Sequence, residues 1–196
     1  LYFKYDGDAF KRVVYTESHD EVANGKARVP EEIWPGNSHH WFAKKRSTMG
    51  AVLVFTAPGI PMIFQGQEFL EDKWFTDTEA LDWEHAKAME GVIYLYRDLM
   101  RLRRNADGVS KGLIGQHIDA YHLNQNAKVL AFHRWYDGGP GDSTVVVMNM
   151  TANPITNYTI GFPATGHWSL RFDSHASVYS ADYEGQVSGD VVAEAG

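Results

Sequence analysis

The stretch Arg12-Val13-Val14-Tyr15-Thr16-Glu17-Ser18-His19-Asp20-Glu21 carries the strongest indication of the fold. Its first half contains β-branched and aromatic side chains that favour a buried strand, and its second half is polar. The same order recurs where Pro61-Met62-Ile63-Phe64 precedes Gln65-Gly66-Gln67-Glu68. Each segment therefore predicts a buried strand that carries polar groups at its carboxyl end.

A helical pattern lies between the two predicted strands. Ser38 is a suitable N-cap for a helix over residues 39–56, and Ala57-Pro58-Gly59 would end that helix. A strand, a helix and a second strand form a βαβ unit, whose two strands run parallel in one sheet. Because functional sites of such folds lie at the carboxyl ends of the strands, we expect the two polar segments to lie together.

The second half of the chain has a different pattern. An amphipathic helix is predicted over residues 89–104, and short alternating runs separated by turn residues follow from about residue 112, as in an antiparallel sandwich. The fold class is therefore α/β plus all-β, with one domain over residues 1–110 and a second over residues 111–196, which we expect to be truncated. We expect no closing strand after residue 180, and strands over residues 120–123, 129–136, 144–150, 155–160 and 168–172.

Composition excludes several classes of function. The 196 residues carry 18 Lys and Arg against 25 Asp and Glu, a net charge of −7, so we expect no nucleic-acid partner. The longest apolar stretch, residues 49–64, contains two prolines and is too short for a membrane span, so we expect no membrane segment. Cysteine is absent, which excludes thiolate zinc sites and thiol catalysis and fits either redox environment. We expect a cytoplasmic location.

Residues 17–21 offer the most chemistry. Three carboxylates and an imidazole at a strand end can supply acid, base or electrostatic functions, although the same residues also suit a turn that caps backbone amides. One alternative is a metal-dependent hydrolase that uses His19, Asp20, His39 and His40. Neighbouring histidines on a helix point about 100° apart, however, and no zinc-binding spacing is present. Tryptophans predicted in loops, Trp34 and Trp74, are candidates for stacking on sugar rings.

Together these segments resemble the alpha-amylase family, glycoside hydrolase family 13, and within it the branching-enzyme-like members. Residues 16–26 look like the family's last conserved catalytic region, at the end of its seventh barrel strand. Residues 59–68 are similar to its eighth strand, with a structural motif of Gly59, Pro61, Gly66 and Glu68.

The resemblance extends along most of the chain. Residues 81–83 and 96–103 look like the approach to the last barrel helix and its body, and residues 145–150 look like a central strand of the C-terminal sandwich. The resemblance therefore implies the last βα units of a (β/α)8 TIM barrel, followed by the family's all-β domain.

The resemblance also assigns roles to individual residues. Asp20 is expected to stabilise the oxocarbenium-like transition state, His19 to hydrogen-bond the reacting sugar, and Glu21 and Trp34 to contact the substrate. The implied substrate is an alpha-1,4-glucan such as glycogen or starch, processed by transfer or hydrolysis with a retaining mechanism. Neither a cofactor nor a metal is implied.

The family's nucleophile and general acid lie on earlier strands, and their motifs are absent from these 196 residues. We therefore expect a C-terminal fragment that is inactive alone, whose partner is the missing N-terminal half of the barrel. Its exposed barrel edge would favour self-association. The alternative, from another functional class, is a non-catalytic glucan-binding or interaction module.

Overall fold

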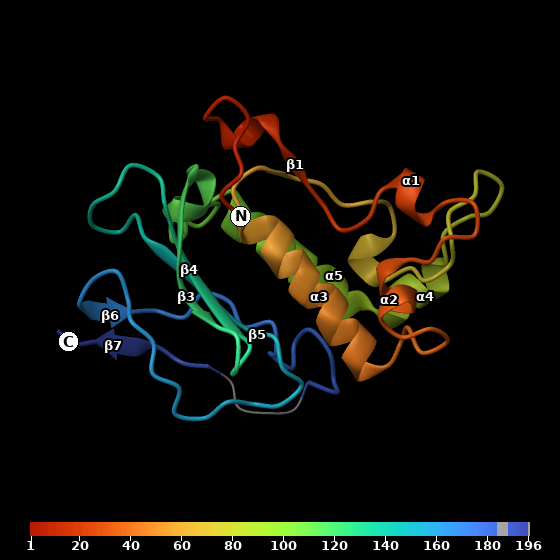
Figure 1. Cartoon of the computed structure of the whole chain (residues 1–196). Coiled ribbons are helices and arrows are strands. Elements are labelled where there is room, and N and C mark those ends of the chain that lie inside the picture. Colours follow the sequence, from red (N-terminus) through yellow and green to blue (C-terminus); the bar gives the residue numbers. More distant parts are fainter. Residues whose placement is uncertain (184–187, 196) are drawn as a thin grey trace.

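The computed structural model describes residues 1–183 and 188–195 (Figure 1). The α-helices are α1 His19–Val22, α2 Val29–Ile33, α3 Trp41–Thr56, α4 Trp83–Ala88 and α5 Glu90–Arg103. The 3-10 helices are η1 Ala9–Lys11, η2 Gln67–Phe69 and η3 Lys111–Ile114. The strands are β1 Val13–Val14, β2 Ile60–Pro61, β3 His117–Asn124, β4 Val129–Trp135, β5 Thr144–Asn149, β6 Gly166–Trp168 and β7 Val191–Ala193.

The parallel pairing of β1 with β2 confirms the predicted strand–helix–strand unit. Val13 lies opposite Ile60, and the amides of Ile60 and Met62 donate to the carbonyls of Arg12 and Val14 at 2.8 and 2.9 Å. Pro61 lies between these two donors and has no N–H of its own to donate. Proline therefore fits β2, which pairs with a single strand among the described residues. Both strands are shorter than the sequence predicts, because beyond Val14 hydrogen bonds from side chains replace the backbone hydrogen bonds between the strands.

Helix α3 connects the two strands and packs against α5. Ser38 is not the N-cap of α3: its hydroxyl donates to Asp72 at 2.7 Å, and the Nδ1 of His40 accepts the amide of Phe42 instead. Helix α5 matches its predicted range within a residue at each end. Its apolar stripe meets α3 in one core, where buried side chains include Val52, Phe55, Val92, Leu95, Tyr96 and Leu99.

The all-β part contains an antiparallel sheet of order β3-β4-β5 and a separate β6-β7 pair. Phe132 of β4 is fully buried and packs with Ile118 and Met148 against Met49 and Leu53 of α3. The sheet therefore rests on the helix that follows β1. Two buried arginines reinforce this contact: Arg103 donates to the carbonyls of Ala57 and Leu113, and Arg134 donates to those of Thr56 and Gly115.

Three predictions about the second half were wrong. Residues 155–160 form no strand, because Asn157 adopts a left-handed φ of +55° and the Tyr158 hydroxyl bonds to side chains of β3. The strand expected at 168–172 lies at residues 166–168, since the Leu170 amide donates to the Asp190 carboxylate. A closing strand does exist: β7 pairs antiparallel with β6, although residues 184–187 and 196 of that stretch lie outside the described part.

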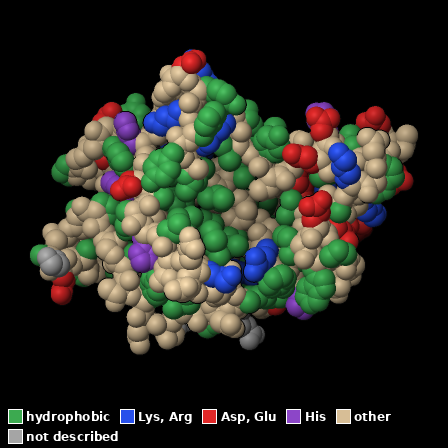
Figure 2. All heavy atoms as spheres, in the orientation of Figure 1, with side chains coloured by type: hydrophobic (Ala, Val, Ile, Leu, Met, Phe, Trp, Pro, Cys, Tyr) green, Lys and Arg blue, Asp and Glu red, His purple; other side chains and the backbone are tan. Residues whose placement is uncertain are grey.

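An apolar surface is left open beside β1 and β2. Val13 and Ile60, which face each other across the pair, are 47% and 48% exposed. Tyr2, Phe3 and Tyr5 of the preceding segment are also exposed. Figure 2 shows hydrophobic side chains gathered across the middle of this face of the molecule, between the N-terminal segment and the lobe that carries α1.

Candidate functional site

The carboxyl ends of β1 and β2 meet, as the sequence predicts. The side-chain amide of Gln67, in η2 just beyond β2, donates to the Thr16 hydroxyl just beyond β1 at 2.5 Å. The other end of that amide accepts the Phe64 amide at 3.1 Å. Gln67 thus ties the end of each strand to the other, and the polar residues that follow both strands share one edge.

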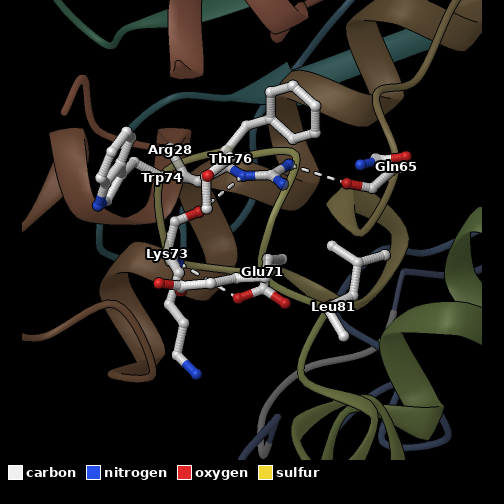
Figure 3. Close-up of a pocket in the computed structure, with 10 residues that line it drawn as sticks. Arg28, Gln65, Glu71, Lys73, Trp74, Thr76 and Leu81 are labelled. Atoms are coloured by element: carbon white, nitrogen blue, oxygen red, sulfur yellow. Dashed lines mark hydrogen bonds between the residues drawn. The ribbon is translucent and has the colours of Figure 1, made fainter. Parts of the chain in front are cut away.

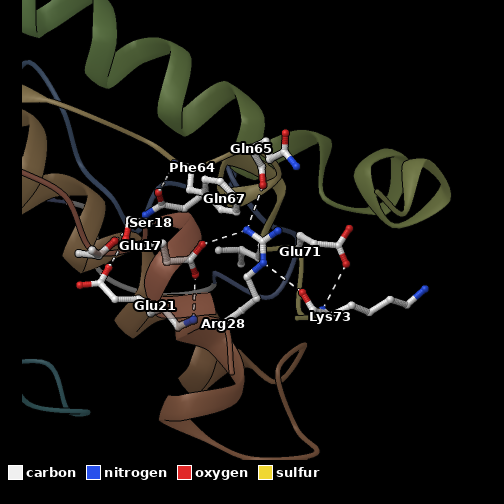
Figure 4. A network of polar contacts seen from close by, with 12 residues as sticks. Glu17, Ser18, Glu21, Arg28, Phe64, Gln65, Gln67, Glu71 and Lys73 are labelled. Atoms are coloured by element: carbon white, nitrogen blue, oxygen red, sulfur yellow. Dashed lines mark hydrogen bonds and ion pairs between the residues drawn. The ribbon is translucent and has the colours of Figure 1, made fainter. Parts of the chain in front are cut away.

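A buried ion pair lies behind this edge (Figure 4). Glu17 and Arg28 are each 1% exposed, and the Arg28 guanidinium contacts the Glu17 carboxylate at 3.1 Å. Arg28 also donates to the carbonyls of Gln65 and Lys73 at 2.9 and 3.1 Å, and its guanidinium lies 4.9 Å from the centre of the Phe64 ring. One side chain therefore joins β1, β2 and the following loop.

Glu17 and Arg28, with the backbone groups that they bind, form a buried framework. The second carboxylate oxygen of Glu17 accepts the Val29 amide at 2.8 Å. Burial raises the pKa of Glu17 above its ordinary value of 4.5, and the Val29 amide and the Arg28 charge oppose that rise. With both oxygens engaged and no exposed surface to offer, Glu17 has the environment of a structural carboxylate.

The next residues are presented to solvent on the short helix α1. The Nε2 of His19 lies 3.2 Å from the Asp20 carboxylate, and the two side chains are 69% and 84% exposed. Ser18 donates from its hydroxyl to Glu21 at 2.9 Å, and the Lys26 ammonium donates to the Asp20 backbone carbonyl at 3.0 Å. The backbone of α1 is thereby held while the imidazole and the carboxylates remain open to a ligand.

The four residues of the predicted structural motif surround β2. Gly59 has a φ of +130°, and a Cβ there would lie 2.7 Å from a methyl of Val14. Gly66, with a φ of +86°, is the N-cap residue that precedes η2. Pro61 is in β2 itself, and one oxygen of Glu68 is buried without a hydrogen-bond partner among the described residues. The two glycines allow the chain to pass close to β1 and to turn sharply after β2.

Trp34 follows α2, with its ring edge-on to His40 at 4.4 Å between centroids. The four residues of the metal alternative do not converge. His39 pairs with Asp72 at 2.9 Å, His40 caps α3, and His19 pairs with Asp20. No group of three or more His, Asp or Glu residues within 1–183 and 188–195 is arranged to hold a metal ion.

Sequence reasoning missed Arg28, the bridge that Gln67 makes between the two strand ends, and a small pocket beside α1 (Figure 3). The pocket is lined in part by Arg28, Glu71 and the half-exposed ring of Trp74. The Phe75 amide donates to the Val22 carbonyl at 2.7 Å, which places this loop directly alongside α1. A buried glutamate after a strand requires a cationic or amide partner, but local spacing does not identify which residue supplies it.

In the part of the chain that the structure describes, no helix has the length and apolar character needed to cross a membrane.

Comparison with known proteins gives a family match for the second half of the chain and relatives over nearly all of it. Residues 121–196 match the family described as alpha amylase, C-terminal all-beta domain. A 1,4-alpha-glucan branching enzyme GlgB from Pseudomonas syringae pv. tomato is 31% identical over 195 residues, which is 94% of this chain and 25% of that protein. Its counterpart from Rhodospirillum rubrum is 33% identical over 90% of this chain and 23% of its own length. The chain thus spans about a quarter of the length of these relatives.

Solved structures support the fold. The pullulanase from Anoxybacillus sp. LM18-11 superposes with a TM-score of 0.60 at 20% identity, over 92% of this chain and 26% of the pullulanase. A second structure of that enzyme, complexed with maltotetraose, gives a TM-score of 0.52. Residues 121–196 therefore belong to the family of the alpha amylase C-terminal all-beta domain, and nearly the whole chain is similar to 1,4-alpha-glucan branching enzymes.

Proposed function

We propose that this chain is the C-terminal part of an enzyme that acts on alpha-1,4-glucan. In this proposal residues 1–110 supply the seventh and eighth strands of a (β/α)8 barrel with their helices, and residues 111–196 supply the C-terminal sandwich domain. The observation that carries the proposal is the parallel β1–β2 pair, whose carboxyl ends meet through Gln67 and Thr16 beside an exposed His19–Asp20 pair. Active sites of parallel barrels are built at that end of the strands.

The open surface beside β1 and β2 supports a barrel that continues in both directions. A closed barrel leaves no unpaired strand edge, and neither Val13 nor Ile60 would then stay exposed. By itself the 196-residue chain is expected to self-associate through this surface, and light scattering that shows a stable monomer would count against the barrel assignment.

In this enzyme Asp20 stabilises the positive charge that develops on the reacting sugar. A carboxylate placed at that point acts on the transition state more strongly than on the ground state, which is what acceleration requires. His19, adjacent to it, donates to sugar hydroxyls. Glu21 and Trp34 contact the bound chain, Trp34 through the exposed part of its ring.

Branching is the favoured activity, because the relatives similar over nearly the whole chain are branching enzymes. A retaining mechanism also needs a nucleophilic carboxylate and an acid–base carboxyl group, which we place on other strands of the complete barrel. The isolated chain is accordingly expected to be inactive. A cytoplasmic location belongs to the same proposal.

The test is Asp20→Asn in the complete enzyme that contains this chain, measured by iodine staining of amylose and by the count of new branch points. We expect a loss of about 10²- to 10³-fold in rate, the scale of removing one electrostatic group from an active site. Asp107→Asn, which changes an exposed aspartate paired with Arg101, should retain activity. Retained activity in Asp20→Asn would refute the assigned role. Glucan binding without transfer or hydrolysis by the unmodified enzyme would instead favour the binding-module alternative.

A further inference from the structure

The loop between α1 and α2 contains the dipeptide Asn24-Gly25, the one Asn-Gly pair in the sequence. Asn24 and Gly25 have φ values of +58° and +80°, and the Lys26 amide donates to the Ala23 carbonyl at 3.2 Å. Two consecutive positive φ values closed by this bond form the mirror-image turn that Asn-Gly favours.

The Asn24 side chain and the backbone of Gly25 in this turn are open to water. Asn24, Gly25 and Lys26 are exposed, and no atom lies within 4 Å of the position that a Cβ on Gly25 would occupy. Within the described residues, no hydrogen bond holds the Asn24 side chain or the Gly25 amide. In contrast, the side chains of Asn105 and Asn124 both bond to backbone or side-chain groups.

We propose that Asn24 is a site of spontaneous deamidation. The backbone nitrogen of Gly25 attacks the Asn24 side-chain carbonyl carbon, the side-chain nitrogen leaves as ammonia, and a cyclic succinimide remains. Water then opens the ring at either carbonyl and gives aspartate or isoaspartate. The sum is amide plus water to carboxylate plus ammonium, with no oxidant or cofactor.

The folded structure offers little resistance to this reaction. Attack requires rotation about the Asn24 backbone, which breaks the Lys26–Ala23 hydrogen bond. Because that bond is long and exposed, it protects the turn by no more than about tenfold relative to the unfolded chain. Glycine leaves its own nitrogen unshielded, whereas any other residue would cover it with a Cβ.

The product alters the exposed edge described above. It carries an additional negative charge in the loop that directly follows Asp20 and Glu21 of α1, and isoaspartate lengthens the backbone by a methylene. Lys26, which donates to the Asp20 carbonyl at 3.0 Å, is two residues away. The modification is therefore expected to loosen the contact that fixes the backbone of α1.

The experiment incubates the purified protein at mildly alkaline pH, digests it with trypsin, and follows the peptide that ends at Lys26 by mass and by enzymatic methylation of isoaspartate. Asn157 is the matched control, since it is exposed and has a φ of +55° but precedes Tyr158. The same chain unfolded in denaturant supplies the reference rate, and Asn24→Gln should abolish the reaction.

We expect the Asn24 peptide of the folded protein to convert within about tenfold of the unfolded rate, while the Asn157 peptide stays unmodified over the same time. Protection of folded Asn24 by much more than tenfold would overturn the proposal, because the turn would then be closed to attack. Equal conversion of Asn157 would also overturn it, because glycine would not be the determinant. Neither outcome depends on enzymatic activity.

Discussion

Glu17 is 1% exposed and bonded to Arg28 and the Val29 amide, whereas the side chain of Asp20, three residues later, is 84% exposed beside His19. In the sequence both are carboxylates in one polar run after a strand. The structure divides them into a buried framework group and a group presented to solvent. The difference shows that the role of each carboxylate in this polar segment depends on whether a residue distant in sequence pairs with it.

Removal of Arg28 is the strongest way to break this division. Arg28→Met leaves the Glu17 carboxylate buried without its cation and also removes two bonds to carbonyls. We expect a loss of about 3–5 kcal/mol in the free energy of unfolding, measured by urea denaturation. Arg46→Met is the matched control: Arg46 is exposed and lies 4.7 Å from the centre of the Phe42 ring. Equal small losses in the two variants would show that the buried pair is not the framework.

Gly66→Ala tests whether the end of β2 is as firmly fixed as the end of β1. The added Cβ would lie 2.8 Å from the Cβ of Glu71, at a φ of +86°. We expect a loss of about 1–3 kcal/mol, since both the contact and the backbone conformation become unfavourable. Gly141→Ala has a similar φ of +75° but open space around it, so it isolates the backbone contribution. If urea denaturation shows the same loss in the free energy of unfolding for both variants, the contact with Glu71 does not contribute to the destabilisation.

The pH dependence of stability sharpens the comparison further. Because burial raises the pKa of Glu17 above 4.5, the folded chain holds this proton at pH values where the unfolded chain has released it. Stability from Glu17 is therefore fully present below pH 4.5 and is lost as the pH rises through the raised pKa. Unfolding curves of wild type and Glu17→Gln measured from pH 4 upwards should differ in slope over this interval. Parallel curves would contradict the raised pKa.

The sequence predicted the βαβ unit and α5 because each rests on local periodicity and clear stop signals. The division between Glu17 and Asp20 could not be predicted, since Arg28 becomes a partner only when the loop of residues 23–28 folds back. Ser38 was a reasonable cap by local rules, but Asp72 from a distant loop captures its hydroxyl. Residues 155–160 alternate like a strand, yet Asn157 and the Tyr158 hydroxyl are fixed by a turn and by β3. In each case a contact distant in sequence outweighs the local preference.

The smallest effect on stability is expected for substitutions of the exposed residues His19 and Asp20. His19→Gln and Asp20→Asn each remove one partner of a 3.2 Å pair whose side chains are mostly in water, and such pairs contribute about 0–1 kcal/mol. Urea denaturation of either variant should therefore match wild type within about 0.5 kcal/mol. A loss as large as that of Arg28→Met would mean that His19 and Asp20 support the fold after all. A near-zero loss leaves their geometry free to serve a ligand, because a group that contributes nothing to folding can be selected for binding alone. His19 and Asp20 would then be the solvent-exposed, ligand-binding side chains at the edge where Glu17 and Arg28 form the buried framework.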